Sequence, residues 1–364
     1  MGKQINFFDI YKQDKSIHLS FIKILKNHFK KSDFILGKSV NLFENNFSKF
    51  TKSKYSIGCA NGTDALYLAL KSLNLPKNSE VIVPAMTWIS TVLSILNNNL
   101  KPVLVDVNKN DALISLEEIK KKINKNTKVI LPVNLYGGVV NIQKIKKIVG
   151  KKKIFIIEDS AQAHGGKDDN GNNIGKFSDL ACYSFYPGKN LGCYGDGGMI
   201  TTNNKKYYER LIRLRNLGSK FKHKHEMIGV NSRLDTIQAS LLNLKIKSLR
   251  QNNLKRTNIA NIYKKTIKNK KIDIIQYSKF AVYHQYVILV KNRNKLITIL
   301  DKNNIQYGIH YPISINKLDC FKNIFKGKNF VNAEFIANHC LSLPIDPNLR
   351  TSDQKRICSV LNSY

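Results

Sequence analysis

The sequence of 364 residues lacks the features that would assign it to a membrane or an exported class. It has no apolar run near the roughly 18 residues that a membrane helix needs, and its longest runs are short, like Val129–Val133. The N-terminal stretch MGKQINFFDIYKQDKS has no apolar signal segment, and Asn6 stands where a myristoylation motif has Ser or Thr. The sequence therefore predicts a soluble cytoplasmic protein without a membrane partner.

Acidic residues are few, because 25 Asp and Glu stand against 60 Lys and Arg, giving a formal net charge of +35. Such an excess is typical of non-catalytic nucleic-acid-binding proteins, which is one alternative for this chain. Only nine of the basic residues are Arg, the side chain whose planar fork suits base and phosphate contacts. Since Lys is scattered through every segment, we interpret the charge as composition bias on solvated surfaces and predict no nucleic-acid partner.

Cysteines number six, and none forms a CxxC pair or a zinc-ligand spacing. Most have apolar neighbours, which is typical of buried free thiols in a reducing compartment. His223 and His225 lie two residues apart in a Lys-rich loop that offers no further ligand pattern. We predict no metal site.

The order of apolar patterns along the chain predicts an α/β fold. From residue 62 onward, helical spacing alternates with short apolar strands, which is typical of a mostly parallel sheet covered by helices. Between Ala181 and Thr202 the pattern changes to short strands separated by a Gly-rich turn. The predicted strands are Glu80–Val83, Val103–Val105, Val129–Val133 and Ile154–Ile157, and the predicted helices are Thr63–Leu73, Leu116–Ile123 and Ile142–Val149.

A smaller α+β domain is predicted to follow the first. A long helical stretch, Asp235–Lys255, would carry the chain to it. In this second part the pattern predicts strands at Tyr283–Val290 and Ile305–His310 and a helix at Lys295–Lys302. The predicted division is a large domain over residues 1–250, which includes the N-terminal segment, and a small C-terminal domain over residues 251–364.

Two motifs in the first hundred residues are candidates for a ligand site. In GCANGTDALYLAL (Gly58–Leu70), Gly62 and Thr63 open a helix whose free N–H groups can face an anion, although an ordinary capped helix has the same pattern. VPAMTWIS (Val83–Ser90) places the only tryptophan, Trp88, just after a strand, where it is either a core residue or a platform for ring stacking.

Two later motifs add a carboxylate and a lysine. IIEDSAQAHGG (Ile156–Gly166) is an apolar strand that ends in Asp159, and α/β folds bind ligands at the carboxyl ends of parallel strands; a helix N-cap is the alternative. SFYPGKNLGCYGDGGMI (Ser184–Ile200) holds Lys189 between Pro-Gly and a Gly-rich loop, where its amine can reach a bound aldehyde, although an exposed lysine in a turn has the same pattern. It is not a Walker A loop, because the upstream glycine is missing.

Taken together, the four motifs predict a site for pyridoxal phosphate (PLP). A phosphate cradle, a stacking aromatic ring, a carboxylate and a lysine on one α/β domain are the parts that hold this cofactor. The lysine forms the Schiff base, and the carboxylate keeps the pyridine nitrogen protonated so that the ring accepts electrons.

These motifs, in this order, resemble the sugar aminotransferases of the DegT/DnrJ/EryC1/StrS group, which are fold-type I PLP enzymes. The resemblance also covers FILGKSVNLFENNFSKF (Phe34–Phe50), GVNSRLDTIQAS (Gly229–Ser240) and IHYPISINK (Ile309–Lys317), and so nearly the whole chain. It implies a fold-type I architecture with a large α/β domain, a mostly parallel sheet and a smaller C-terminal α+β domain.

The resemblance also implies roles for individual residues. Lys189 would be the Schiff-base lysine and Asp159 the partner of the pyridine nitrogen. The other implied cofactor contacts are Gln162 with the phenolic oxygen, Trp88 with the ring, and Gly62, Thr63 and Ser184 with the phosphate. Asn231 would reach the phosphate from the neighbouring subunit of a homodimer with shared active sites, and Arg233, His310 and Tyr311 would lie near the sugar nucleotide.

The activity that the resemblance implies is transfer of an amino group from L-glutamate to a keto carbon of a nucleotide-linked hexose for surface polysaccharide synthesis, and C3 is the carbon that we expect. Family dehydratases have His in place of the lysine, so Lys189 favours transamination, with PLP-dependent dehydration as an alternative. Many relatives have Pro at Ser314 and His at Asn316, whereas Asn316-Lys317 is more similar to enzymes for UDP-linked 3-keto-N-acetylhexuronates. Both these sugars and dTDP-linked 3-keto-6-deoxyhexoses remain open.

Overall fold

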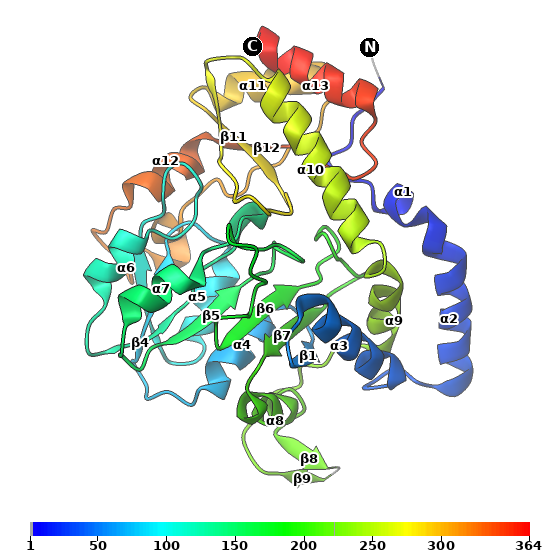
Figure 1. The fold of residues 1–364 in the computed structure, drawn as a ribbon, viewed down its shortest axis with the longest axis vertical. Helices are drawn as coiled ribbons and strands as arrows, with labels where there is room; N and C mark the ends of the chain where they lie inside the picture. Colours follow the sequence, from blue (N-terminus) through cyan, green and yellow to red (C-terminus); the bar gives the residue numbers. More distant parts are fainter. Residues whose placement is uncertain (1–2, 222) are drawn as a thin grey trace.

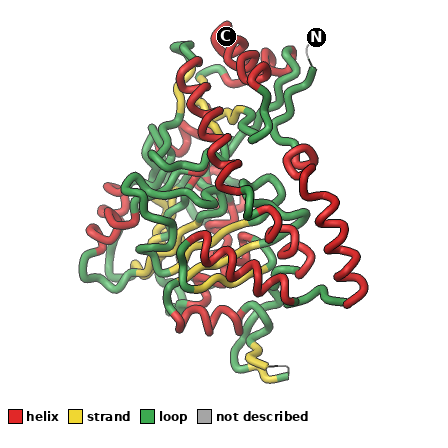
Figure 2. The backbone as a smooth tube through the Cα atoms, turned by 45° about the vertical axis from the view of Figure 1, so that its right-hand side comes forward, coloured by secondary structure: helices red, strands yellow, loops and turns green. Residues whose placement is uncertain are grey.

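The structure, a computed structural model, describes residues 3–221 and 223–364 and is built around a seven-stranded sheet with helices on both faces (Figures 1 and 2). The strand order is β1-β7-β6-β5-β4-β2-β3, and only β7 runs antiparallel to its neighbours. The predicted mostly parallel α/β sheet is therefore confirmed. The strands are β1 (Tyr55–Cys59), β2 (Glu80–Pro84), β3 (Lys101–Val105), β4 (Thr127–Ile130), β5 (Phe155–Asp159), β6 (Leu180–Ser184) and β7 (Gly198–Thr202).

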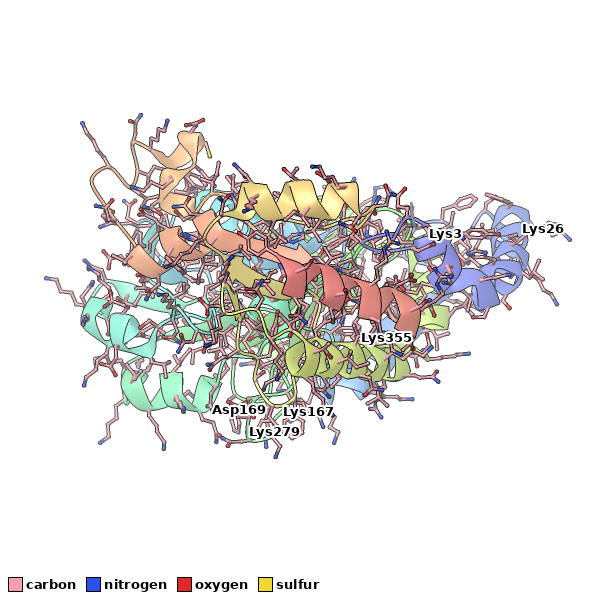
Figure 3. The ribbon with its side chains drawn as sticks, turned by 90° about the horizontal axis from the view of Figure 1, so that it is seen from above. Lys3, Lys26, Lys167, Asp169, Lys279 and Lys355 are labelled. Atoms are coloured by element: carbon pink, nitrogen blue, oxygen red, sulfur yellow. The ribbon has the colours of Figure 1, made fainter. Side chains whose placement is uncertain are left out.

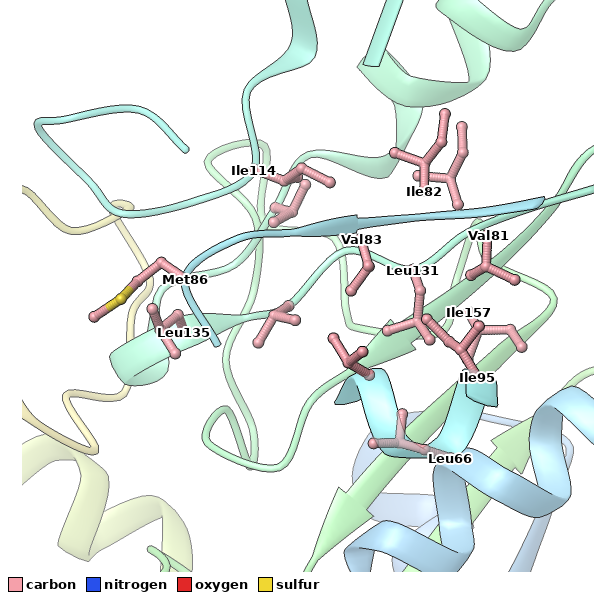
Figure 4. Close-up of a cluster of buried hydrophobic side chains, with 14 of the residues drawn as sticks. Leu66, Val81, Ile82, Val83, Met86, Ile95, Ile114, Leu131, Leu135 and Ile157 are labelled. Atoms are coloured by element: carbon pink, nitrogen blue, oxygen red, sulfur yellow. The ribbon is translucent and has the colours of Figure 1, made fainter. Parts of the chain in front are cut away.

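The centre of this sheet is buried on both faces, because helices cover each side of its parallel strands. Every residue of β2 is buried. Figure 4 shows Val81, Ile82 and Val83 of this strand among aliphatic side chains from neighbouring strands and from the helices α4 (Gly62–Ser72) and α5 (Ile89–Leu96). A strand that is buried on both faces requires consecutive apolar residues, which β2 has from Val81 to Pro84.

Toward β7 the two faces of the sheet pack against different helices. Side chains alternate along a strand, so Cys182 and Ile200 join the cluster that contains α4, whereas Tyr183 and Met199 join a second cluster. That second cluster holds residues of α3 (Lys38–Thr51) and α9 (Thr236–Lys245). The remaining helices beside the sheet are α6 (Leu116–Lys122), α7 (Ile142–Val149) and α8 (Lys205–Leu214).

A second, three-stranded antiparallel sheet lies toward the C-terminus, with the order β10-β11-β12. Its own apolar cluster includes residues of three helices and the N-terminal residue Ile5. The predicted domain boundary at residue 250 falls at the start of the helix α10 and stays a prediction. The elements are β10 (Ile272–Ile274), β11 (Tyr286–Val290), β12 (Cys340–Leu343), α10 (Leu249–Thr266), α11 (Arg293–Lys302) and α13 (Thr351–Ser363).

Two predicted elements were wrong. The helix predicted over Asp235–Lys255 is two helices, α9 and α10, because the chain turns at Ser248, whose hydroxyl donates to the carbonyl of Lys245. The strand predicted over Ile305–His310 is not a strand. Ile305 forms a single bridge with Ile5 and Gly308 a single bridge with Ser342, so its two ends pair with different segments and no ladder forms.

The remaining elements lie at the edges of the molecule. The helices α1 (Ile10–Asp14) and α2 (His18–Lys31) run along one side, and α8 with the hairpin β8 (Ser219–Phe221) and β9 (Lys224–His225) projects away from the two termini (Figure 1). The helix α12 (Val331–His339) precedes β12. Among the described residues, no helix is both long and apolar enough to cross a bilayer.

Lysine side chains are spread over the surface. Lys26 on α2, Lys279 before β11 and Lys355 on α13 are all exposed and lie on separate parts of the molecule (Figure 3). This distribution agrees with our interpretation of the charge as a general property of the surface.

Candidate active site

A cavity of about 600 Å³ lies between the carboxyl ends of the central strands and the C-terminal part of the chain. Such clefts are the usual ligand sites of open α/β sheets. Of the predicted site residues, the cavity brings together Gly62, Thr63, Trp88, Asp159, Gln162, Ser184, Lys189, His310 and Tyr311.

Lys189 lies in the turn between β6 and β7. Its backbone N–H donates to the carbonyl of Tyr186 (2.9 Å), and Gly192 lets the loop fold back closely, since a Cβ there would come within 2.4 Å of the Pro187 carbonyl oxygen. Burial lowers the pKa of the Lys189 amine to about 8, an effect that the charge of Asp159 partly opposes. A substantial fraction of this amine is therefore neutral, and nucleophilic, at mildly alkaline pH.

Asp159 ends β5, beside Cys182 of β6. Its carboxylate accepts hydrogen bonds from the Thr91 hydroxyl (2.8 Å) and the Ala161 backbone N–H (3.2 Å), and the Thr91 hydroxyl also contacts that of Thr87. Burial raises the pKa of Asp159 above its ordinary value despite these bonds. A cationic ligand would stabilise the charged form of this buried carboxylate.

The first turn of α4 forms the opposite end of the site. The N-cap Asn61 occupies two of the helix's first N–H groups, since its side chain accepts from Asp64 and its carbonyl from Ala65. The N–H groups of Gly62 and Thr63 precede these and are left for an anion. A Cβ on Gly62 would lie 2.5 Å from the Ser184 Cβ, so glycine allows this serine to reach the helix N-terminus.

A layer of polar and aromatic side chains connects these two ends. The Gln162 amide donates to the Tyr311 hydroxyl (2.8 Å) and accepts from the Tyr136 backbone N–H (2.7 Å), which fixes its orientation. Trp88 is 54% exposed and tilts against Tyr311, with ring centroids 5.1 Å apart. Trp88 is therefore a wall of the cavity, and the alternative of a core residue is wrong.

His310 completes this wall. Its Nδ1 lies 2.8 Å from the Ser342 hydroxyl, its ring stacks on Phe7, and its carbonyl accepts from the hydroxyl of Tyr136. Burial, together with the charge of Lys189, lowers the pKa of His310 to about 4, so the imidazole is neutral at physiological pH.

Sequence reasoning missed several residues of the cavity. Thr91 was passed over because a threonine one helical turn after a tryptophan carries no signal without the fold. Phe7 and Phe8 come from the N-terminal segment, which the Ile5–Ile305 bridge and a hydrogen bond from Phe7 to Gln306 hold against the C-terminal part. Further missed lining residues include Tyr186, Arg256, His284 and Gln285.

Asn231 and Arg233 do not line the cavity within the described chain. Asn231 is exposed and bridges to Asn216, and the Arg233 guanidinium donates to the Asn216 side chain (3.1 Å). Both residues lie before α9 with side chains accessible from outside the chain. Their predicted role at the site of a neighbouring subunit stays a prediction.

Ser314 and Asn316, on which the comparison of sugar classes depended, also lie outside the cavity lining. Both are buried, and the Asn316 amide donates to the carbonyl of Lys328 and to the carboxylate of Glu334, while its oxygen accepts from Ser314. Their hydrogen bonds stabilise the loop after Tyr311.

The residues of the cavity fit pyridoxal phosphate. Free N–H groups at α4 suit a dianionic phosphate, and the buried carboxylate of Asp159 has no cation within 4.0 Å among the described residues. A pyridinium N–H would supply that partner, and the exposed face of Trp88 would cover the ring. No three His, Cys, Asp or Glu side chains of the described chain are arranged to hold a metal ion.

Comparison with known proteins gives matches over nearly the entire chain. The sequence model of the DegT/DnrJ/EryC1/StrS aminotransferase family matches residues 15–362. The dTDP-3-amino-3,6-dideoxy-α-D-galactopyranose transaminase of Aneurinibacillus thermoaerophilus is 39% identical over 364 residues, covering 100% of this chain and 98% of the relative. The UDP-2-acetamido-2-deoxy-3-oxo-D-glucuronate aminotransferase of Pseudomonas aeruginosa is 33% identical over 361 residues, covering 99% and 100%.

A solved structure is similar to this chain over its whole length. The crystal structure of S. venezuelae DesV in complex with a ketimine intermediate superposes with a TM-score of 0.96 at 30% identity, covering 100% of this chain and 98% of that chain.

Proposed function

Because the chain belongs to the DegT/DnrJ/EryC1/StrS aminotransferase family, we propose that it transfers the amino group of L-glutamate to the C3 keto carbon of a nucleotide-linked hexose. The chain is a nucleotide-sugar aminotransferase that uses pyridoxal phosphate. The glutamate donor, the position C3 and the identity of the sugar are parts of the proposal.

The observation that carries the proposal is the joint presence of Lys189 and Asp159 in one cavity, with the α4 N-terminus beside them. A lysine whose pKa burial lowers to about 8 can release and take up a proton near neutral pH. It therefore suits the proton transfer that transamination needs at the substrate carbon. The histidine that replaces this lysine in the family's dehydratases is absent, so dehydration is not favoured.

Each residue has a defined task in the proposed reaction. When bound, PLP supplies an aldehyde that takes up the amino group and a ring that withdraws electrons from the substrate carbon. Lys189 anchors the cofactor and then moves a proton at the substrate carbon with its amine. Asp159 holds a proton on the pyridine nitrogen, and Thr91 orients its carboxylate. Gln162, held by Tyr136 and Tyr311, positions the ring oxygen.

For the acceptor, we propose a dTDP-linked 3-keto-6-deoxyhexose first and a UDP-linked 3-keto-N-acetylhexuronate second. The greater identity with the dTDP-sugar transaminase supports this order. The burial of Asn316 weakens the case for the hexuronate, because that side chain cannot read a sugar group directly. His310 and Tyr311 line the cavity where the sugar would enter.

We also propose that the enzyme is a homodimer with shared sites and serves surface polysaccharide synthesis. The positions of Asn231 and Arg233 outside their own chain's cavity support the dimer, because their amide and guanidinium groups suit the phosphate of a ligand in the neighbouring subunit.

For the location of the enzyme, we propose the cytoplasm. All six cysteines are unpaired, which suits a reducing compartment of this kind.

The test is a reaction with purified protein. The enzyme, saturated with PLP and L-glutamate, is incubated with dTDP-linked 3-keto-6-deoxyhexoses and, separately, with UDP-linked 3-keto-N-acetylhexuronates. Mass spectrometry is expected to show the keto oxygen replaced by an amino group in the first set. Loss of oxygen without gain of nitrogen would instead identify a dehydratase.

A further inference from the structure

Among the described residues, no carboxylate forms a direct ion pair with the buried cation of Arg256. It lies on α10 and is 5% exposed, yet no carboxylate oxygen of the described chain lies within 4.0 Å of its guanidinium. Within the described part of the chain, its guanidinium forms one hydrogen bond, from NH1 to the carbonyl of Ile345 (2.9 Å), and its Nε has no partner. Arg215, buried to a similar degree, shows the ordinary arrangement, because it pairs with Glu44 and the carbonyl of Gly58.

Asp346 attracts Arg256 but forms no direct ion pair with it. Asp346 acts on it only over a longer distance, and the carboxylate of Asp346 accepts instead from the backbone N–H groups of Asn348 (2.8 Å) and Asp9 (3.2 Å). Burial lowers the pKa of Arg256 to about 10, so the side chain stays charged at neutral pH. A buried charge that is only partly compensated is costly, which points to an anionic ligand as its missing partner.

Arg256 lines the same cavity as Lys189, and the buried His284 of this cavity feels the charges of both. Asn190, next to Lys189, has its side-chain oxygen 3.2 Å from the His284 Nδ1. His284 is neutral, since burial and then the charges of Lys189 and Arg256 lower its pKa well below the ordinary value. It therefore lies within electrostatic reach of both cations but does not offset either charge.

Gln285 adds a second unsatisfied group at this wall. Its amide nitrogen lies 3.4 Å from His284 Nε2, and its oxygen is buried without a partner. Because neutral His284 donates from Nδ1 to the Asn190 oxygen, its Nε2 accepts from the Gln285 NH2 group, whose second N–H remains for a ligand. Guanidinium and amide donors together form a typical carboxylate site, and the apolar Ile345 beside them excludes water.

We propose that Arg256, assisted by Gln285, binds a carboxylate group of the amino donor. The inference rests on the proposed function, in which L-glutamate delivers its amine at Lys189. A single carboxylate suits a buried guanidinium, whereas the diphosphate of a nucleotide sugar carries more charge and is costlier to desolvate. A hexuronate acceptor also has a carboxylate, and it is the alternative ligand for Arg256.

The experiment separates the two half-reactions of the PLP-loaded enzyme. Conversion of the cofactor by L-glutamate is followed by absorbance without any sugar, and the return conversion is followed with a nucleotide-linked keto sugar. Isothermal titration with glutarate, a dicarboxylate without an amine, measures binding without turnover. Arg256→Gln is compared with Lys255→Gln, which removes an exposed charge from the neighbouring position of the same helix.

We expect Arg256→Gln to weaken glutarate binding about 10- to 100-fold and to slow the glutamate half-reaction to a similar extent. The sugar half-reaction should change by less than about twofold, and Lys255→Gln should behave as the wild type. Unchanged glutarate affinity, or a loss shared equally by both half-reactions, would overturn the proposal. A loss confined to the sugar half-reaction would overturn the assignment to the donor.

Two further measurements remain informative if Arg256→Gln does not fold. Arg256→Lys keeps the charge and should lose only part of the affinity, because a lysine cannot form the forked contact. The wild-type enzyme should bind glutarate but not the uncharged diol of the same carbon chain, and equal binding of the two would refute a charged subsite. If glutamate converts the cofactor but no nucleotide sugar accepts the amine, the proposed acceptor fails while the Arg256 subsite stands.

Discussion

The chemistry of the cavity depends on the pair Lys189 and Asp159, whose burial moves their pKa values toward each other. Burial lowers the pKa of the lysine and raises that of the carboxyl group, because both lose hydration of the charged form. The charge of each residue also favours the charged form of the other. This mutual attraction therefore opposes the effect of burial on both pKa values. The protonation of one residue is therefore sensitive to substitution of the other.

The first prediction concerns the pH dependence of cofactor attachment. The rate at which added PLP becomes bound covalently to the apoprotein should rise through a midpoint of about pH 8 and then level off, since only the neutral Lys189 amine reacts. Stopped-flow absorbance gives the rates, and borohydride reduction followed by peptide mapping identifies the lysine. A midpoint near the ordinary lysine value of 10.5, or an adduct on another lysine, would contradict it. Lys189→Ala should abolish turnover while still binding the cofactor through its phosphate.

The second prediction is that Asp159→Asn lowers the rate of transamination at least about a hundredfold, or roughly 2.7 kcal/mol of transition-state stabilisation. The substitution keeps the shape but removes the charge that favours a protonated pyridine nitrogen. It should also lower the pH midpoint of cofactor attachment, because the charge of Asp159 raises the pKa of Lys189. Near-normal turnover with an unshifted midpoint would mean that the carboxylate only caps the chain after β5.

At the scale of elements, the N-terminus of α4 meets the end of β6 at a distance that only glycine permits. Gly62 faces Ser184 so closely that an added methyl group would overlap it. This contact brings two N–H groups and a hydroxyl to one point, which is the geometry that an anion requires.

The third prediction follows from this contact. Gly62→Ala should force α4 and β6 apart and weaken PLP binding about tenfold or more, as measured by titration of the apoprotein with the cofactor. Gly138→Ala is the control, because a Cβ there would meet its neighbours only at ordinary contact distances of 3.4 Å and beyond. Equal affinities of the two variants would show that the cofactor's phosphate is held elsewhere.

At the scale of the whole molecule, one chain forms the cavity from distant segments but leaves Asn231 and Arg233 outside it. The large sheet contributes Asp159 and Lys189, the C-terminal part contributes His310 and Arg256, and the N-terminal segment adds Phe7. The homodimer that we propose would bring these two side chains to the cavity of a second copy of the chain.

The fourth prediction tests this arrangement by complementation. Lys189→Ala and the double variant Asn231→Ala/Arg233→Ala should each be inactive alone, but mixed dimers should regain part of the activity. In a mixed dimer one site carries both lesions and the other carries none, so about half of the sites are intact. Activity is measured after subunit exchange, and native mass spectrometry confirms the mixed dimers. Mixed dimers that remain inactive would show that the loop serves its own subunit.

The sequence by itself determined the α/β class, most strands of the large sheet and the motifs that meet at the cavity. Those features are local: apolar periodicity specifies strands and helices, and the strand end at Asp159 and the turn at Lys189 follow from a few neighbouring residues. The resemblance to the family added Gln162 and Trp88 to the predicted site. Without it, their residue types would also fit ordinary core positions.

Only the tertiary structure decided which distant residues complete the site. Thr91 supports Asp159 from a helix, and Arg256 and Gln285 reach the cavity from segments with no motif of their own. It also decided that Asn316 is an internal support and that residues 305–310 form no strand. The physical reason is the same in each case: burial, unsatisfied charge and strand pairing depend on neighbours brought together by the fold, and those neighbours lie far away in the sequence.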